Sequence, residues 1–310
     1  MERSIRFRFF QNNLSDMKIL GDAKKIDHDG KELTLEDGHF SLSIQVLNPT
    51  TFRVRSHPLN GSNFPETFAL IREPKPAHFE INDSENEIEI DTGSSKLIIN
   101  KRPIRLRFFS ADGTLISEDD PGLGMVWDES EVTNYRKLQS GERFFGLGEK
   151  TGPLDKAGIQ YRNHNTDAYS YNRDSDPLYV SCPFFMGMAH ERLYGIFFNN
   201  SSQTTFNFGA ANDRFSFFRA ERGPLDYFFF SGPTASSILE NYTALTGRCS
   251  LPPLWSLGFQ QCRYSYFPES EVKRIAQTFR EKELPCDVIY LDIHYMDECK
   301  VFTWDGKKFP

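Results

Sequence analysis

The stretch Val288-Ile-Tyr-Leu-Asp-Ile293 decides how the C-terminal part of the chain folds. It is a nearly continuous apolar run, typical of a strand that is covered on both faces. Upstream, Trp255–Gln260 is apolar enough for another buried strand. Between the two, Ser270 can cap a helix whose apolar residues recur at helical spacing, namely Val272, Ile275, Ala276 and Phe279. Strand, helix and strand in this order predict one βαβ unit of a parallel sheet.

Residues 1 to about 230 have a different pattern. Short runs of β-branched and aromatic residues alternate there with clusters of Gly, Asp, Asn and Pro. The predicted strands include Phe40–Val46, Phe52–Arg55, Glu87–Asp91, Lys96–Ile99, Ile104–Phe109, Leu193–Phe198, Arg214–Phe218 and Leu225–Phe230. Phe supplies 29 of the 310 residues, and this excess suits two sheets that bury bulky rings between them. We therefore expect a mainly β protein with a large antiparallel β-sandwich.

The pattern changes after this sandwich. Pro233–Thr246 reads as a helix with Ile238, Leu239, Tyr242 and Leu245 on one face and Gly247 as its stop. We predict two domains, a β-sandwich over 1–247 and the start of a parallel α/β domain over 248–310. A complete (β/α)8 barrel needs about 250 residues. Since two parallel strands are no finished sheet, 248–310 is expected to be either an appendix of the sandwich or the front part of a barrel in a longer protein.

Composition excludes several classes of function. The formal net charge of −7 argues against nucleic-acid or anionic-membrane binding, and no apolar run is long enough for a transmembrane helix. Residues 1–13 contain three arginines and no apolar core, so a secretory signal is not expected. The cysteines Cys182, Cys249, Cys262, Cys286 and Cys299 are odd in number and widely spaced. They predict reduced, mostly buried thiols in a cytoplasmic protein.

Two polar clusters follow the predicted parallel strands, where α/β sheets bind ligands. Arg263-Tyr-Ser-Tyr266 follows the first strand, and Asp292, His294 and Asp297 stand at the end of the second. A carboxylate that emerges from an apolar strand needs a partner or a ligand, so an Asp292–Arg263 ion pair and a ligand site are both open. Tyr264 is equally consistent with a core ring and a ligand contact. His294 fits a packed or hydrogen-bonded residue better than a catalyst.

At these residues the sequence resembles glycoside hydrolase family 31, which contains retaining α-glucosidases and α-xylosidases. The matching stretches, in chain order, are Phe145–Lys150, Tyr171–Asp174, Leu251–Gly258, Leu257–Tyr266, Leu284–Asp297 and Phe302–Asp305. The resemblance covers about 145 to 310 well, whereas 1 to 144 fit only in being β-rich. It implies a mutarotase-like β-sandwich (a supersandwich) followed by the first βαβ unit of a (β/α)8 barrel.

The resemblance also implies a set of substrate-binding residues. Asp292 resembles the acid that hydrogen-bonds sugar hydroxyls in the −1 subsite, and Ile293 resembles an apolar wall of that pocket. Tyr264 resembles the aromatic residue that lines the same pocket. Asp174, with Arg173 before it, resembles the tip of a sandwich loop that reaches over the barrel mouth. His294 departs from the family pattern, since many members carry Asp there.

The catalytic carboxylates of the family are not among these residues. The resemblance places the nucleophile in a W-x-D-M-N-E segment and the acid/base on a later Asp, and the 310 residues contain neither segment. Both carboxylates are therefore expected beyond Pro310, in a longer protein. Within the 310 residues, no catalytic residue, metal or cofactor is assigned.

These observations lead to one expected function and several alternatives. We expect the N-terminal part of a retaining α-glucosidase that acts on α-linked oligosaccharides, with the 310 residues inactive by themselves. The alternatives are an α-xylosidase, α-galactosidase or α-transglycosylase, or a stand-alone sugar-binding sandwich. Homo-oligomer formation stays open.

Overall fold

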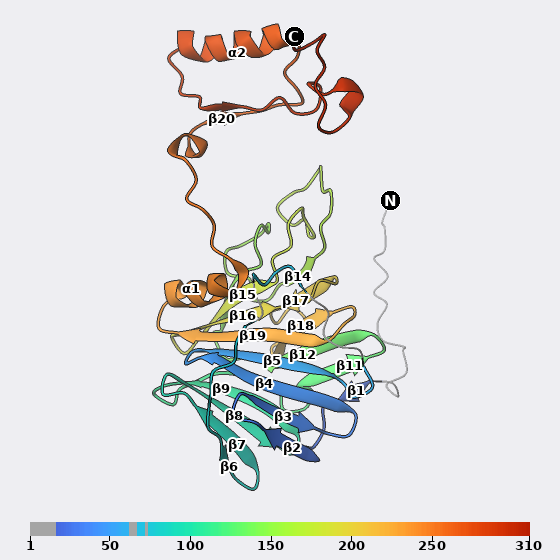
Figure 1. The fold of residues 1–310 in the computed structure, drawn as a ribbon, viewed down its shortest axis with the longest axis vertical. Coiled ribbons are helices and arrows are strands. Elements are labelled where there is room, and N and C mark those ends of the chain that lie inside the picture. The colour runs from blue at the N-terminus through green and yellow to red at the C-terminus, as the bar shows by residue number, and fades with distance from the viewer. Residues whose placement is uncertain (1–16, 62–66, 72–73) are drawn as a thin grey trace. The chain divides into compact units, whose positions relative to one another are not determined.

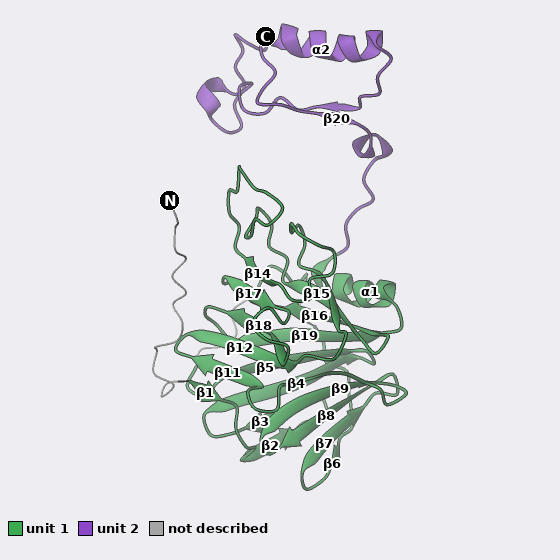
Figure 2. Cartoon of the chain, turned by 180° about the vertical axis from the view of Figure 1, so that it is seen from behind, with its two compact units in different colours: residues 1–247 green, residues 248–310 purple. Residues whose placement is uncertain are grey.

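The computed structural model describes residues 17–61, 67–71 and 74–310. The chain divides into two compact units, residues 1–247 and 248–310, and each is described here by itself (Figures 1 and 2). The expectation for residues 1–13 lies outside the described residues. No helix within the described ranges is long and apolar enough to cross a membrane.

In the part of the first unit that the structure describes, the strands form three antiparallel sheets. The eight-stranded sheet has the order β13 (Arg143–Gly146), β15 (Phe184–Ala189), β16 (Arg192–Phe198), β19 (Leu225–Gly232), β5 (Thr51–Pro58), β4 (Phe40–Asn48), β3 (Glu32–Glu36) and β2 (Lys25–His28). The six-stranded sheet has the order β1 (Lys18–Ile19), β11 (Met125–Asp128), β12 (Glu131–Lys137), β18 (Phe215–Ala220), β17 (Thr204–Asn207) and β14 (Gln160–Asn163). The five-stranded sheet has the order β10 (Leu115–Glu118), β9 (Ile104–Ser110), β8 (Ser95–Lys101), β7 (Glu87–Asp91) and β6 (Asn82–Asp83).

Every predicted strand before residue 231 is present, and the sheets stack as layers around a shared core (Figure 1). Aromatic rings fill that core, as the Phe excess predicts. Phe108 stacks on Phe229 with ring centroids 3.9 Å apart, and Phe144 stacks on Phe208 at 4.4 Å. Because these rings come from distant strands, their burial ties the sheets together. The predicted β-sandwich is confirmed.

A helix covers part of the eight-stranded sheet. Helix α1 (Ala235–Thr246) begins at Thr234, whose side chain accepts a hydrogen bond from the Ser237 N–H, and it ends at Gly247 with φ 99°. Ile238 is fully buried, and the Tyr242 ring stacks on Phe184 at 4.0 Å. Leu239, predicted on the same face, is 41% exposed instead. Positions 238 and 242 are one helical turn apart and share the face that contacts the sheet, whereas position 239 is rotated away from it.

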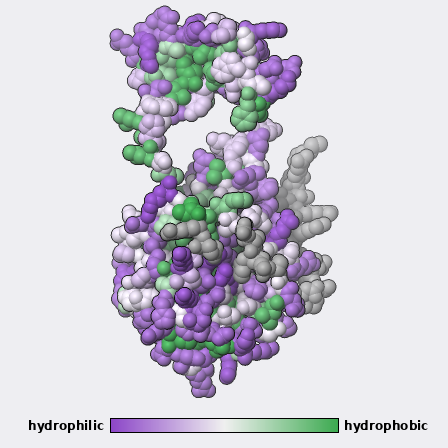
Figure 3. Space-filling view, viewed as in Figure 1, coloured by the Kyte–Doolittle hydropathy of each residue, from purple (hydrophilic) through white to green (hydrophobic). Residues whose placement is uncertain are grey.

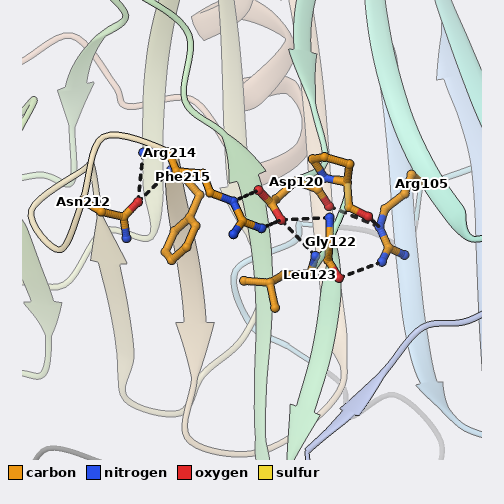
Figure 4. A network of polar contacts seen from close by, with 8 residues as sticks. Arg105, Asp120, Gly122, Leu123, Asn212, Arg214 and Phe215 are labelled. Carbon is orange, nitrogen blue, oxygen red and sulfur yellow. Dashed lines mark hydrogen bonds and ion pairs between the residues drawn. The ribbon is translucent and has the colours of Figure 1, made fainter.

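Asp120 forms the centre of a polar network between sheets (Figure 4). Its carboxylate accepts hydrogen bonds from Nε and Nη2 of Arg214 at 2.9 and 2.6 Å, and from the backbone N–H of Gly122 and Leu123. Nε of Arg105, on β9, donates to the Asp120 carbonyl at 3.2 Å. Burial by itself raises the pKa of Asp120, but the hydrogen bonds outweigh it and hold the pKa below its usual value. The network therefore stabilises the fold in the ionised state.

The second unit contains the predicted parallel βαβ arrangement in a shorter form. Strand β20 (Gln260–Gln261) pairs parallel with β21 (Val288–Ile289), and helix α2 (Glu269–Glu281) connects them. Two 3₁₀ turns, Leu254–Leu257 and Asp297–Cys299, flank this unit. The (β/α)-type start predicted from Val288–Ile293 is thus present, although its strands are only two residues long.

Two local predictions in this unit are wrong. Trp255–Gln260 is no buried strand, because Pro253, with its fixed φ of −65°, starts the 3₁₀ turn and Trp255 is 59% exposed. Ser270 does not cap α2. Pro268 holds the N-cap position without a side-chain cap, and Glu269 and Glu271 in the first turn complement the helix dipole instead.

Apolar side chains of the second unit are largely exposed in the described residues, as the green surface of this unit in Figure 3 shows. No residue of α2 is buried. The prediction of mostly buried cysteines is wrong as well, since only Cys286 is buried, Cys182 is half-buried and the other three are exposed. All five are free thiols.

Candidate functional site

Asp292 and Tyr264 both follow parallel strands of the second unit, at the ends where the strands leave the sheet. Asp292 comes three residues after β21 and has φ 60°, a left-handed conformation that costs a non-glycine residue energy. Its side chain is exposed, and among the described residues it has no hydrogen-bond or ion-pair partner. A strained, exposed carboxylate without a partner is available to bind a ligand.

The ion pair that the sequence left open for Asp292 is not formed within the described residues. The Arg263 guanidinium instead lies over the Tyr266 ring, 5.9 Å from its centroid. Tyr264 is 76% exposed, so it is not a core ring of this unit. Ile293 is half-buried next to Asp292. The second unit thus carries an exposed acid, an exposed aromatic ring and an apolar side chain at one edge.

His294 connects the two segments that carry Asp292 and Tyr264. Its Nδ1 lies 2.7 Å from Oγ of Ser265. The imidazole also stacks on Phe267, with centroids 4.9 Å apart, and meets Tyr264 edge to face at 5.5 Å. His294 is therefore a packed, hydrogen-bonded residue, as the sequence favoured.

Arg173 and Asp174 belong to the first unit and lie exposed in a long loop between β14 and β15. The backbone N–H of Asp174 donates to Oδ1 of Asn172 at 2.8 Å, which tightens the turn at the loop tip.

A buried ion pair anchors the base of that loop. Nζ of Lys150 lies 2.8 Å from Oδ1 of Asp176, and the Lys150 side chain is only 1% exposed. Oγ1 of Thr151 donates to the Ser175 carbonyl at 2.7 Å. These contacts hold the loop at Ser175 and Asp176, one and two residues after Asp174.

The two catalytic carboxylates are expected after Pro310 and so are not among the residues of this chain. Pro310 itself is exposed in the second unit. The described residues carry an acid and an aromatic ring after the two parallel strands, but the two closely spaced carboxyls that retention requires are not assigned among them. Their position after Pro310 therefore stays a prediction.

Sequence reasoning missed several supporting residues. Lys150 stands in a quoted motif, yet nothing in the pattern tells a buried lysine from an exposed one. Ser265 lies in the quoted Leu257–Tyr266 stretch, but its bond to His294 spans 29 positions and depends on the parallel pairing of the strands. A polar residue directly after each strand is the signal that comes nearest to indicating this contact.

A β-sandwich is followed by parallel strands, and an acid and an aromatic ring stand just after the strand ends. Comparison with family models identifies the class of protein. The glycosyl hydrolase 31 N-terminal galactose mutarotase-like domain matches residues 41–207, and the family 31 TIM-barrel domain matches residues 249–310. Because the first match alone spans more than half of the chain, the chain belongs to glycoside hydrolase family 31.

Known relatives carry related names. The chain is 42% identical over 271 residues to "Alpha-glucosidase 2" of Bacillus thermoamyloliquefaciens, and the match covers 87% of this chain and 34% of that protein. It is 35% identical to "Alpha-glucosidase" of Saccharolobus solfataricus over 61% of this chain and 27% of that protein. The chain therefore spans about a third or less of the length of these relatives.

Solved structures agree on the fold. A family 31 dextranase of Flavobacterium johnsoniae, in a complex with isomaltotriose, superposes with a TM-score of 0.87 at 32% identity. The match covers 94% of this chain and 36% of that one. The α subunit of glucosidase II superposes with a TM-score of 0.77 at 21% identity, which supports the fold alone.

Proposed function

We propose that the whole protein is a retaining α-glucosidase that releases glucose from the ends of α-linked oligosaccharides. The observation that carries the proposal is the 42% identity to "Alpha-glucosidase 2" over 271 residues, since a match of this length within 310 residues includes both the sandwich loop and Tyr264. Family membership supports glycoside hydrolysis as the chemistry. The proposal concerns the whole protein, because the chain spans only part of the relatives' length.

Within this function, Asp292 binds sugar hydroxyls. An unpaired carboxylate accepts two hydrogen bonds from neighbouring hydroxyls, and charge-assisted bonds of this kind are the stronger ones. Tyr264 offers an exposed ring for the apolar face of the sugar, and Ile293 supplies an apolar wall. We assign the three side chains to the binding of one hexose unit.

The sandwich loop contributes a second set of contacts in this proposal. Arg173 and Asp174 at its tip are exposed and charged, and the Lys150–Asp176 pair holds the base of the loop. A charged tip on a rigid base suits hydrogen bonding to substrate hydroxyls beyond the first sugar. Hydrolysis with retention also needs two carboxyls about 5–5.5 Å apart, and neither role is assigned to Asp292.

A panel of nitrophenyl glycosides, assayed with the full-length gene product, tests the substrate class. We expect the highest kcat/KM for the α-glucoside, with the α-xyloside and α-galactoside far behind. A preference for either of the others would replace α-glucosidase by the corresponding activity. Transfer of glucose to added maltose, in excess over hydrolysis, would identify a transglycosylase.

The linkage needs a separate comparison, since the dextranase relative is in a complex with isomaltotriose whereas both named sequence relatives are α-glucosidases. Maltose and isomaltose, supplied at equal concentration, distinguish the two cases. We expect glucose release from both. Internal cleavage of dextran without early release of glucose would favour a dextranase.

A further inference from the structure

The first unit contains a hollow at one end of the sandwich that the proposed function does not use. It has a volume of about 390 Å³ and is lined by the end of β14, the start of β17, the end of β16 and the segment before β15. Asn163 and Thr204 are direct partners across β14 and β17, so they stand side by side in its wall. The hollow therefore takes its walls from both the six-stranded and the eight-stranded sheet.

Several buried polar atoms in this wall have no partner. Both polar atoms of the Asn163 amide, Oγ of Ser181 and Oδ1 of Asn199 are buried without a hydrogen bond among the described residues. The Asn163 residue is only 4% exposed. Folded proteins rarely leave buried amides unpaired, so these four atoms are hydrogen-bonding groups that water or a bound ligand can satisfy.

A hydrogen bond to Asp226 fixes the orientation of the Asn199 amide. Its Nδ2 donates to Oδ2 of Asp226 at 2.8 Å, and Asp226 in turn pairs with Arg53 in a buried bidentate contact. The amide is therefore held with its nitrogen toward Asp226, and Oδ1 is left as an acceptor for a donor in the hollow. Asn163, with both atoms unpaired, offers one acceptor and two donor hydrogens.

The rest of the wall indicates the chemistry of the ligand. The described lining residues include no Asp, Glu, Lys or Arg, and most of the polar ones carry amides or hydroxyls. Phe68 lies at the rim with its ring fully exposed, and the Phe197 ring forms part of the wall. Neutral donors and acceptors beside exposed aromatic surface match a sugar, whose hydroxyls both donate and accept.

We propose that this hollow, defined by Asn163, Ser181, Asn199 and Phe68, is a second carbohydrate-binding site that holds one or two neutral hexose units. Asn163 binds a pair of hydroxyls, Asn199 accepts from a third, and Phe68 covers the apolar face. The site lies wholly in the first unit and includes none of the residues assigned above. It would hold an oligosaccharide on the first unit.

Nuclear magnetic resonance on the ¹⁵N-labelled 310-residue chain tests the proposal. The side-chain amide signals of Asn163 are identified by their loss in Asn163→Leu. On titration with methyl α-D-glucoside, we expect saturable shifts of the Asn163 and Asn199 side-chain signals. Backbone signals of Tyr264 and Asp292 report separately on the second unit, so that failure of one site is distinguishable from failure of the other.

Two substitutions give the matched comparison. Asn163→Leu keeps the side-chain volume and removes the hydrogen bonds, and we expect binding about tenfold weaker or worse with an equal or higher melting temperature in the absence of sugar. Phe68→Ala should also weaken binding. Phe302→Ala is the control, because Phe302 is 100% exposed in the second unit and does not line the hollow.

Three results would overturn the proposal. The first is the absence of any saturable shift, which means that water alone fills the hollow. The second is an equal response to glycerol, which means an adventitious polyol only. The third is wild-type affinity in Asn163→Leu, which places the bound sugar elsewhere.

Discussion

Oγ of Ser265 lies 2.7 Å from Nδ1 of His294, so one hydrogen bond joins the segment after β20 to the segment after β21. Ser265 directly follows Tyr264, and His294 stands two positions after Asp292. The contact therefore fixes the spacing of the aromatic ring and the acid that we assign to sugar binding. We infer that His294 acts as a positioning residue for Tyr264 and Asp292.

Removal of this contact should weaken catalysis by the full-length enzyme without unfolding it. We expect His294→Ala to lower kcat/KM up to about tenfold, the value of one lost hydrogen bond. His294→Asn should recover part of the loss, because an amide can replace Nδ1. Ser265→Ala should cost the same or less, because it leaves the His294 ring packed on Phe267 and Tyr264, and the double variant should lose no more than His294→Ala. Additive losses would show that the two residues act separately.

Substitution of Asp292 should lower kcat/KM far more than substitution of His294. Asp292→Asn keeps the shape of the side chain and removes the charge, so charge-assisted hydrogen bonds to the sugar are lost. We expect kcat/KM for an α-glucoside to fall about 10- to 100-fold. Asp297→Asn is a matched control, since Asp297 is an exposed acid five residues further on that pairs with Lys300. Equal activity of Asp292→Asn and the wild type would remove Asp292 from the site.

The buried Lys150–Asp176 pair should contribute to both stability and loop position. Lys150→Met leaves the partly buried Asp176 carboxylate with the Arg162 backbone N–H but without its ion-pair partner, and we expect a loss of about 3 kcal/mol in the free energy of unfolding. The KM for oligosaccharides should rise more than kcat falls, because the loop tip at Asp174 loses its rigid base. Lys300→Met, at an exposed pair, should change neither quantity. Unchanged KM in Lys150→Met would separate the loop from substrate binding.

The lowered pKa of Asp120 predicts how the stability of the fold changes with acid. Because its pKa is held below the usual Asp value, the ionised group stabilises the fold above the unfolded pKa of about 3.9, and this contribution is lost as the pH falls through the folded value. At pH 7, Asp120→Asn should cost about 1.5–3 kcal/mol, measured by denaturant unfolding. Its difference from the wild type should shrink below pH 4. A difference that is independent of pH would exclude ionisation of Asp120 as the cause.

The sandwich was predictable because its strands are local patterns. Glu87–Asp91 alternates acidic and apolar residues, and in the structure Ile88 and Ile90 are fully buried. The second unit was less predictable. Trp255 and the residues around it are apolar, but tertiary contacts decide which side chains they pack against. The two prolines before them favour a turn over a strand.

The candidate site shows the same division. The positions of Asp292 and Tyr264 after the two parallel strands were predictable from the sequence pattern, whereas their role in sugar binding stays a prediction. The Ser265–His294 bond and the buried state of Lys150 were not, because each depends on residues that meet only after folding. The unpaired amide of Asn163 was the least predictable of these features, since no sequence pattern marks a polar side chain that is buried without a hydrogen-bond partner.

Proton NMR of the first product released by the full-length enzyme tests the central claim most directly. On hydrolysis of an aryl α-glucoside, observed before mutarotation equilibrates the anomers, we predict α-glucose as the initial product. Release of β-glucose first would contradict retention. No release of glucose by the full-length enzyme would contradict the account of an α-glucosidase altogether.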